Sequence, residues 1–160
     1  MAGIARGCVV AVVAVSALRQ RIAAVVEGLA TPGPWHESRW NFQDFPRDPG
    51  TYAHLSFAVG TPIWRFNSIM ESFRAKRGAL GGLVDTEFVV RWTYRIRADR
   101  QVADLDAALD AEAVLVTALA GVAMTDAHIG ISQARRSVVG DGTWMLGEVS
   151  LLVQHRIAIQ

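Results

Sequence analysis

Histidine and cysteine are the first residues to test for chemistry, because they bind metals and activate nucleophiles. The four histidines, His36, His54, His128 and His155, are far apart in the chain and show no metal-ligand spacing. Cys8 is the only cysteine, which excludes a disulfide within the chain and a zinc site built on cysteines. We therefore expect no bound metal and no other cofactor.

Clustered carboxylates are the second possibility, because a pair of them can act as general acid and base. Asp106, Asp110 and Glu112 form such a cluster. No base, nucleophile or metal motif stands beside them, and acidic residues are common on the solvent side of a helix. We expect all three to face outward, and we expect that the chain is not an enzyme.

Residues 70–84 are basic and rich in glycine, a composition that can cradle phosphate. The segment lacks the Gly-Lys-Ser/Thr ending of a phosphate-binding loop and does not open a helix. It predicts instead a mobile loop between strands that becomes ordered against a neighbouring subunit. The residues that define this loop are Arg74, Lys76, Arg77, Gly78, Gly81 and Gly82.

Composition limits the class of protein further. The chain has 160 residues, which fits one domain over 1–160, and its 51% hydrophobic content excludes intrinsic disorder. A formal net charge of +1 gives no global attraction to nucleic acid or to a membrane. Fifteen of the sixteen basic residues are arginine, which suits ion pairs at interfaces, although a GC-rich genome produces the same bias.

The strongest secondary-structure signal is the alternation of residues 85–97. Apolar side chains from Phe88 to Ile96 occupy one face, and Arg91, Arg95 and Arg97 occupy the other. Such a period of two predicts a strand with one buried face. A polar face of this kind is either solvated or in contact with acidic groups.

The other expected elements surround this strand. Helical spacing predicts a helix over 18–29 and an amphipathic helix over 104–119, the latter capped by Asp104 and buried through Leu105, Leu109, Val116 and Leu119. Alternation predicts strands at 52–59 and 129–139 and one following Trp144, with an extended piece at 63–69 and a glycine turn at 140–142. His155 falls on the apolar face of the last strand, where a core histidine is expected. The fold class predicted is α+β, a small, mostly antiparallel sheet with an N-terminal helix and a central amphipathic helix packed against it.

The N-terminal residues 1–16 have two interpretations. A basic start, a short apolar run and the small residues around Ser16 describe a secretory signal peptide, and the run is too short to span a bilayer. The same valine-rich run can extend the first helix and bury itself against a partner chain. After that helix, residues 35–51 form an aromatic loop anchored by Trp35, Trp40 and Phe42.

The order of these elements resembles the tail terminator proteins of long-tailed bacteriophages and gene transfer particles. The resemblance lies in the long strand from Phe88 that leads into the helix over 99–119, in the closing hairpin from Gly140 to Gln160, and in the helix over 18–29. It covers about two thirds of the chain as a pattern of elements. The valine-rich start and the 35–51 loop depart from the pattern.

The resemblance implies a structural virion protein of the tail or neck that forms a ring, a homohexamer. The ring would cap the tail tube, stop its polymerisation and join it to the head-side connector, while genomic DNA passes through the lumen without sequence readout. The implied partners are the chain itself, the tail tube protein and the head–tail connector protein, with assembly in the host cytoplasm and no membrane. Other neck or tail tube subunits share this architecture, and a secreted or periplasmic non-enzymatic domain remains an alternative.

The two charged faces then predict where subunits meet. Arg91, Arg95 and Arg97 on the strand of one copy would face Asp106, Asp110 and Glu112 on the helix of the next. Pairing of the two sets within one subunit is the competing expectation. Trp35, Trp40, Phe42 and the valine-rich start would supply the apolar part of the interface.

Overall fold

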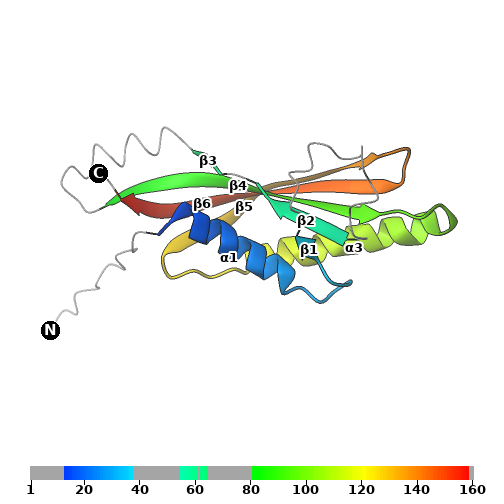
Figure 1. Cartoon of the computed structure of the whole chain (residues 1–160), viewed down its shortest axis with the longest axis horizontal. Helices are drawn as coiled ribbons and strands as arrows, with labels where there is room; N and C mark the ends of the chain where they lie inside the picture. Colours follow the sequence, from blue (N-terminus) through cyan, green and yellow to red (C-terminus); the bar gives the residue numbers. More distant parts are fainter. Residues whose placement is uncertain (1–12, 38–54, 61, 65–80, 159–160) are drawn as a thin grey trace.

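The computed structural model describes residues 13–37, 55–60, 62–64 and 81–158, and these form an α+β fold as predicted (Figure 1). Helices and strands follow in the order α1 (Val15–Glu27), β1 (His36–Glu37), β2 (Leu55–Val59), β3 (Ile63–Trp64), β4 (Gly81–Arg95), the 3-10 helix η2 (Ala98–Arg100), α3 (Gln101–Ala120), β5 (Ala127–Val139) and β6 (Trp144–Ala158). The sheet has the strand order β1-β2-β4-β6-β5, with β3 also paired to β4. Every pair is antiparallel except β1 with β2.

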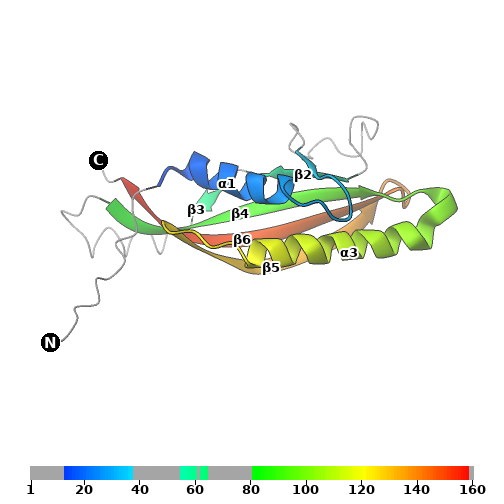
Figure 2. The ribbon, with the colours of Figure 1, turned by 90° about the horizontal axis from the view of Figure 1, so that it is seen from below.

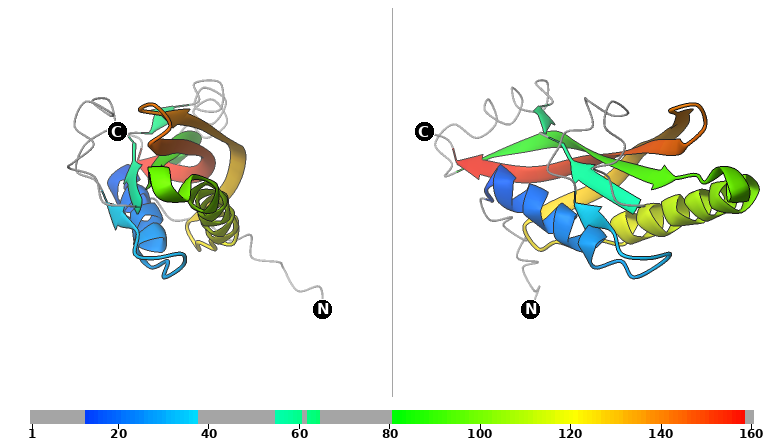
Figure 3. Two further views of the ribbon diagram at one scale, coloured as in Figure 1. Left: turned by 90° about the vertical axis from the view of Figure 1, so that its right-hand side faces the viewer. Right: turned by 45° about the vertical axis from the view of Figure 1, so that its right-hand side comes forward.

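Three long antiparallel strands make up most of the sheet. β4 and β6 have 15 residues each and β5 has 13. At about 3.3 Å per residue the β4–β6 ladder is roughly 50 Å long, whereas the helix α3 is about 30 Å long. The sheet is twisted, and both helices lie on the same side of it (Figures 2 and 3). α1 packs against β1, β2 and α3, and α3 packs against β5 and β6.

The core lies between the helices and the inner face of the sheet. The alternation predicted for β4 is confirmed, because Phe88, Val90 and Trp92 are completely buried. They pack with residues of the two helices and of β6, namely Leu18, Ile22, Val26, Leu115, Leu119, Val149, Leu151 and Val153. Thr93 departs from the pattern, since it is buried although it lies on the outer face.

The inward face of α3 differs from the one predicted. The helix begins at Gln101 and buries Asp104, Ala108, Ala111, Glu112, Leu115 and Leu119. Leu109, predicted to be buried, is 37% exposed. Leu119 is buried as predicted, but the small side chains of Ala108 and Ala111 let the helix lie close to the sheet on their side, so Leu109 turns outward. The prediction considered only large apolar residues and therefore misplaced the buried face of α3.

The first helix begins at Val15, three residues earlier than predicted, but does not continue through the valine-rich run. Ala14 is extended, and the backbone N–H of Val13 donates to the carbonyl of Arg156 at 3.1 Å. The predicted helical extension is thus wrong for Val13 and Ala14. Residues 1–12 lie outside the described residues.

The boundary of the glycine-rich loop is also corrected. Gly81 and Gly82 belong to β4, where they pair with Ala158 and Ile157 of β6. Backbone hydrogen bonds between strands need no side chain, so β4 stays paired with β6 at both glycines. Arg74, Lys76, Arg77 and Gly78 lie outside the described residues, as does the rest of 70–80.

Among the aromatic residues of the predicted 35–51 loop, the structure describes only Trp35. It is 3% exposed, belongs to the core and donates its indole N–H to the carbonyl of Thr31 at 3.3 Å. Its predicted place in a subunit interface is therefore wrong. Trp40 and Phe42 lie outside the described residues.

The terminal hairpin agrees with prediction. Gly140, Asp141 and Gly142 all have positive φ, at 61°, 56° and 85°. This left-handed backbone favours glycine and asparagine or aspartate, which is why the turn could be located from its sequence.

Candidate functional site

A bulge divides β5 into two halves with different surroundings. Ile131 pairs with Leu151 and Gln133 with Ser150, so Ser132 is an extra residue without a partner of its own. Its hydroxyl donates to the carbonyl of Ser150 at 3.2 Å. One added residue reverses which side chains point inward. After the bulge, Arg136 points to the helix side of the sheet and Arg135 to the outer side.

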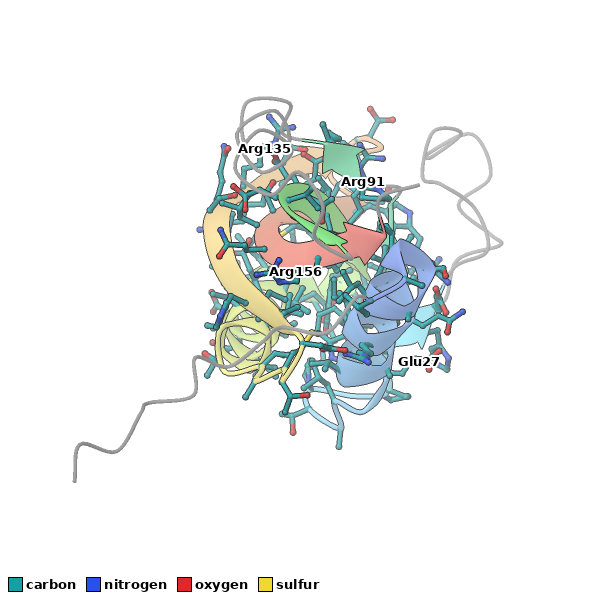
Figure 4. The ribbon with its side chains drawn as sticks, turned by 90° about the vertical axis from the view of Figure 1, so that its left-hand side faces the viewer. Glu27, Arg91, Arg135 and Arg156 are labelled. Atoms are coloured by element: carbon teal, nitrogen blue, oxygen red, sulfur yellow. The ribbon has the colours of Figure 1, made fainter. Side chains whose placement is uncertain are left out.

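On the outer side, Arg135 completes a ladder of charges across three strands. Arg91 of β4 and Arg135 of β5 both lie opposite Glu148 of β6. The Nε atoms of Arg91 and Arg135 donate to separate oxygens of the Glu148 carboxylate, at 2.9 and 2.6 Å. Figure 4 shows both arginines on the side of the sheet away from the helices.

Glu148 is the charged centre of this ladder. Burial alone would raise the pKa of Glu148, but the hydrogen bonds from the two arginines lower it below its ordinary value. Glu148 is therefore ionised at neutral pH, and two guanidinium groups share one carboxylate. The side chain of Arg135 is 70% exposed.

On the inner side, Arg136 forms an ion pair with Glu112 of α3. Glu112 is 7% exposed, so the prediction that it faces outward is wrong. The pair lies next to Gly147, which is the partner of both Arg136 and Trp92. A Cβ atom at Gly147 would lie 2.1 Å from the Trp92 ring, so only glycine leaves room for the indole.

Arg97, predicted to lie in a subunit interface, forms an ion pair inside the chain. Its Nε and one terminal nitrogen donate to the two oxygens of Asp104 at 2.9 and 3.0 Å, and its backbone N–H donates as well at 2.9 Å. These hydrogen bonds hold the pKa of the buried Asp104 carboxyl well below its usual range. Asp104 thus ties η2 and α3 to the end of β4, instead of capping a helix that starts beside it.

The remaining predicted residues are exposed. Arg95 projects from the outer face of β4, and Asp106 and Asp110 project from α3. None of the three has an ion pair with another residue that the structure describes. No described ion pair joins the strand arginines to Asp106, Asp110 or Glu112, so the expected pairing within one subunit does not occur among them.

Sequence reasoning missed Arg135, Arg136, Gly147 and Glu148. Counting back from the turn at 140–142 would have placed Arg135 opposite Glu148 and Arg136 opposite Gly147, because hairpin register is set by the turn. That signal was available in the sequence.

His155 is a core histidine, as predicted. It is fully buried, and its Nε2 lies 3.1 Å from the hydroxyl of Thr86. Burial lowers the pKa of its imidazole, against smaller opposing contributions from a backbone hydrogen bond at Arg156 and from the charge of Asp85. It is therefore neutral at physiological pH.

Within the described ranges, no three or more histidine, cysteine, aspartate or glutamate side chains gather as a metal site would require. No described helix is both long and apolar enough to cross a membrane. A comparison with known protein families found no match, and neither did a comparison with curated proteins.

Proposed function

We propose that this chain is a structural subunit of a bacteriophage tail or neck that assembles into a homohexameric ring. The ring ends the growth of the tail tube and binds the head-side connector. It surrounds the genomic DNA without reading its sequence.

The observation that carries this proposal is the exposure of the half of β5 that follows the bulge at Ser132. All seven residues from 132 to 138 are exposed, and although Arg136 pairs with Glu112, this half of the strand is covered far less than the half before the bulge. Val138 alone is 53% exposed. A strand at the edge of a sheet also offers unpaired backbone groups, and such an edge is usually shortened or covered. Assembly with another subunit covers it.

The element order adds support for the particular kind of assembly. A long strand that leads into a helix, followed by a terminal hairpin, is the pattern on which the resemblance to tail terminators rests. The same elements build one α+β sheet with both helices on one side. This leaves the exposed edge strand β5 and the hairpin turn for contacts between subunits.

A tail tube subunit is the second candidate, because the exposed strand edge suits continuous polymerisation as well as ring closure. Head-to-tail contacts close into a ring when the rotation fits and form a filament when it does not.

The experiment is to measure the mass of the purified full chain in solution and to image it by electron microscopy. A terminator forms closed rings and, when mixed with the tail tube protein encoded beside it, caps one end of each tube. Long tubes formed by this chain alone identify a tube subunit instead. A monomer that binds neither tubes nor itself at any salt concentration contradicts the proposal.

A further inference from the structure

The half of β5 that follows the bulge has a described strand on only one side. β5 ends the sheet, so β6 pairs with one of its edges, and no described strand pairs with the other. We define the open edge as residues 132–138, all of which are exposed. An edge of this kind presents backbone N–H and C=O groups that can bind an added strand through main-chain hydrogen bonds.

α3 runs along the helix side of the open edge (Figure 2). Glu112 of α3 forms an ion pair with Arg136 of the edge. The start of the helix lies at the hairpin turn, because a Cβ atom on Gly142 would be 3.8 Å from Nε2 of Gln101. These two contacts place about three turns of α3 beside the open edge.

Exposed apolar side chains follow the open edge on its helix side. Val138 lies two residues after Arg136, so it points to the same side of the sheet. Val102 and Leu109 precede Glu112 by ten and three residues, and helical spacing places both within about a quarter turn of it around the helix. Val138 is 53% exposed, Val102 73% and Leu109 37%. We define these three residues as the apolar strip, which an apolar strand added to the open edge would cover.

The arginines of the open edge oppose its pairing with the same edge of a second copy. Two copies joined through one shared edge are related by a two-fold axis, and their strands are antiparallel. When the open edges overlap, Arg135 and Arg136 of one copy lie opposite the same two residues of the other, and like charges placed in this way are destabilising. The arginines therefore favour a different segment as the added strand, and the apolar strip favours one that is apolar and uncharged.

Residues 8–12 of this chain have the composition of such a strand. We define the valine run as these five residues, Cys-Val-Val-Ala-Val, which carry no charge and are rich in a β-branched side chain. The run leads into Val13, whose backbone N–H donates to the carbonyl of Arg156 at 3.1 Å, and into Ala14, which is extended. The chain thus enters the described part of the fold already hydrogen-bonded to a strand.

The valine run cannot cover the open edge of its own chain. Gln133, where pairing resumes after the bulge, lies opposite Ser150, whereas Val13 is bonded to Arg156, six residues further along β6. Six residues of strand span about 20 Å, and the five residues of the valine run span at most about 18 Å. Even fully extended along β5, the run would end beside the half that precedes the bulge. The run of a second copy has no such limit.

We infer that the valine run of one copy adds to the sheet of the next copy as a strand on its open edge, with valine side chains against the apolar strip. This inference rests on the proposed ring and names the segment that joins its subunits. Each copy gives one strand and receives one, so the contact is head-to-tail and can close into a ring. Main-chain hydrogen bonds hold the added strand, and burial of the valines and of the apolar strip stabilises it.

Crosslinking through Cys8 tests where the valine run binds. Cys8 is the only cysteine, so a bismaleimide joins copies of the natural chain no further than a dimer. Gln133→Cys and Ser137→Cys each add a second cysteine at the open edge, and Ala103→Cys adds one on the exposed side of α3 as the control. Neighbouring strands are about 4.8 Å apart, which the reagent spans from Cys8. We expect a ladder of larger covalent oligomers on a denaturing gel from at least one edge variant and not from the control.

Adjacent prolines in the valine run test whether it binds as a strand. Successive backbone N–H groups of a strand point to opposite edges, so Val9→Pro with Val10→Pro removes the one that faces the open edge. We expect association, measured by analytical ultracentrifugation, to weaken by about tenfold or more. Ala2→Pro with Gly3→Pro is the matched control outside the run and leaves association unchanged. Both pairs precede Val13, so both variants keep the natural circular dichroism spectrum and urea midpoint.

The outcomes separate this inference from the proposed function. If the natural chain does not associate, the ring fails and strand addition with it. If rings form but neither edge variant gives a ladder, or if the prolines in the run leave association unchanged, the ring stands and strand addition is wrong. A crosslink confined to single chains shows that the run covers its own edge, and an intact mass that begins beyond residue 12 shows a cleaved signal peptide. A ladder that the tail tube protein abolishes while rings persist shows that a strand of that protein takes the open edge. Each of these three results also overturns the inference.

Discussion

The two halves of β5 belong to one strand and pair with one partner, yet they differ in what covers them. Before the bulge, Ala127 is buried and Ile129 and Ile131 pack against the core. After it, the residues from 133 to 138 are exposed. The apolar residues of the first half bury surface against the core, while the second half is held by the ladder with β6 and by two arginine ion pairs. Backbone pairing with β6 and burial in the core thus contribute separately to the stability of this one strand.

The difference shows how one inserted residue decides on which side of the sheet Arg135 and Arg136 each lie. If Ser132 paired with Ser150 as an ordinary strand residue, Arg135 would lie opposite Gly147 and Arg136 opposite Leu146, so the two arginines would exchange sides of the sheet. Arg136 would then leave Glu112, and Arg135 would leave Glu148. The bulge therefore sets both the internal ion pair and the charge of the outer face.

The largest expected effect comes from filling the space beside Trp92. Gly147→Val places a side chain within the indole ring, and we expect a loss of about 3 kcal/mol in the free energy of unfolding. Gly130→Val is the matched control in the first half of β5, because a Cβ atom there meets nothing within 4 Å. Urea denaturation of both variants measures the contrast. Equal stability of the two would mean that Trp92 is not held against Gly147.

Deleting Ser132 tests the bulge itself. The deletion joins Ile131 to Gln133, so these residues keep Leu151 and Ser150 as partners and every side chain keeps its face. It removes the local bend and added twist that a bulge gives its strand, and we expect a loss of about 2 kcal/mol in the free energy of unfolding. Ser132→Ala keeps the extra residue and removes only the hydroxyl that donates to Ser150, so it costs less than about 1 kcal/mol. Urea denaturation of the two variants side by side separates the effect of the bend from that of the hydrogen bond. A deletion as mild as the alanine variant would mean that the bend adds nothing to the stability of the sheet.

The smallest effect concerns His155, which pairs with Ala127 in the packed half. Burial lowers its pKa, so the unfolded chain binds a proton more readily than the folded one. Its contribution to stability is complete above the unfolded pKa of about 6.5 and is lost as pH falls below that value, by up to about 1.4 kcal/mol per pH unit. Free energies of unfolding at pH 7.5 and 5.5 measure the loss, and His155→Leu removes it. His128→Gln, a change at an exposed histidine of the same half, keeps the pH dependence; a flat response in the natural chain would contradict this account.

Local patterns were enough to predict the strands, the turn and the fold class. The alternation from Phe88 to Ile96 and the glycines at 140 and 142 are signals that a few residues carry by themselves. Positions that depend on contacts between elements were predicted poorly. The inward side of α3 follows from the close approach of Ala108 and Ala111, and the pairing of Arg97 with Asp104 follows from where β4 ends.

The same distinction between local signals and contacts between elements applies to the candidate site. Arg95, Asp106 and Asp110 are exposed as predicted, because surface charge at a regular spacing is visible in sequence. Glu112 was assigned to the wrong side because nothing local shows that Arg136 of the sheet pairs with it. Trp35 was assigned to an interface because an aromatic residue in a loop gives no sign of the core beneath it.

The tight turn at 140–142 also has a consequence for the order in which the chain folds. β5 and β6 are joined by the shortest connection between long strands, so their pairing closes a small loop and loses little chain entropy. β4 meets β6 only across η2, α3 and β5, which makes its contacts non-local and slow to form. We expect the hairpin to form first and β4 to join it later. Substitutions in the turn would then slow refolding, whereas substitutions in β4 would chiefly speed unfolding.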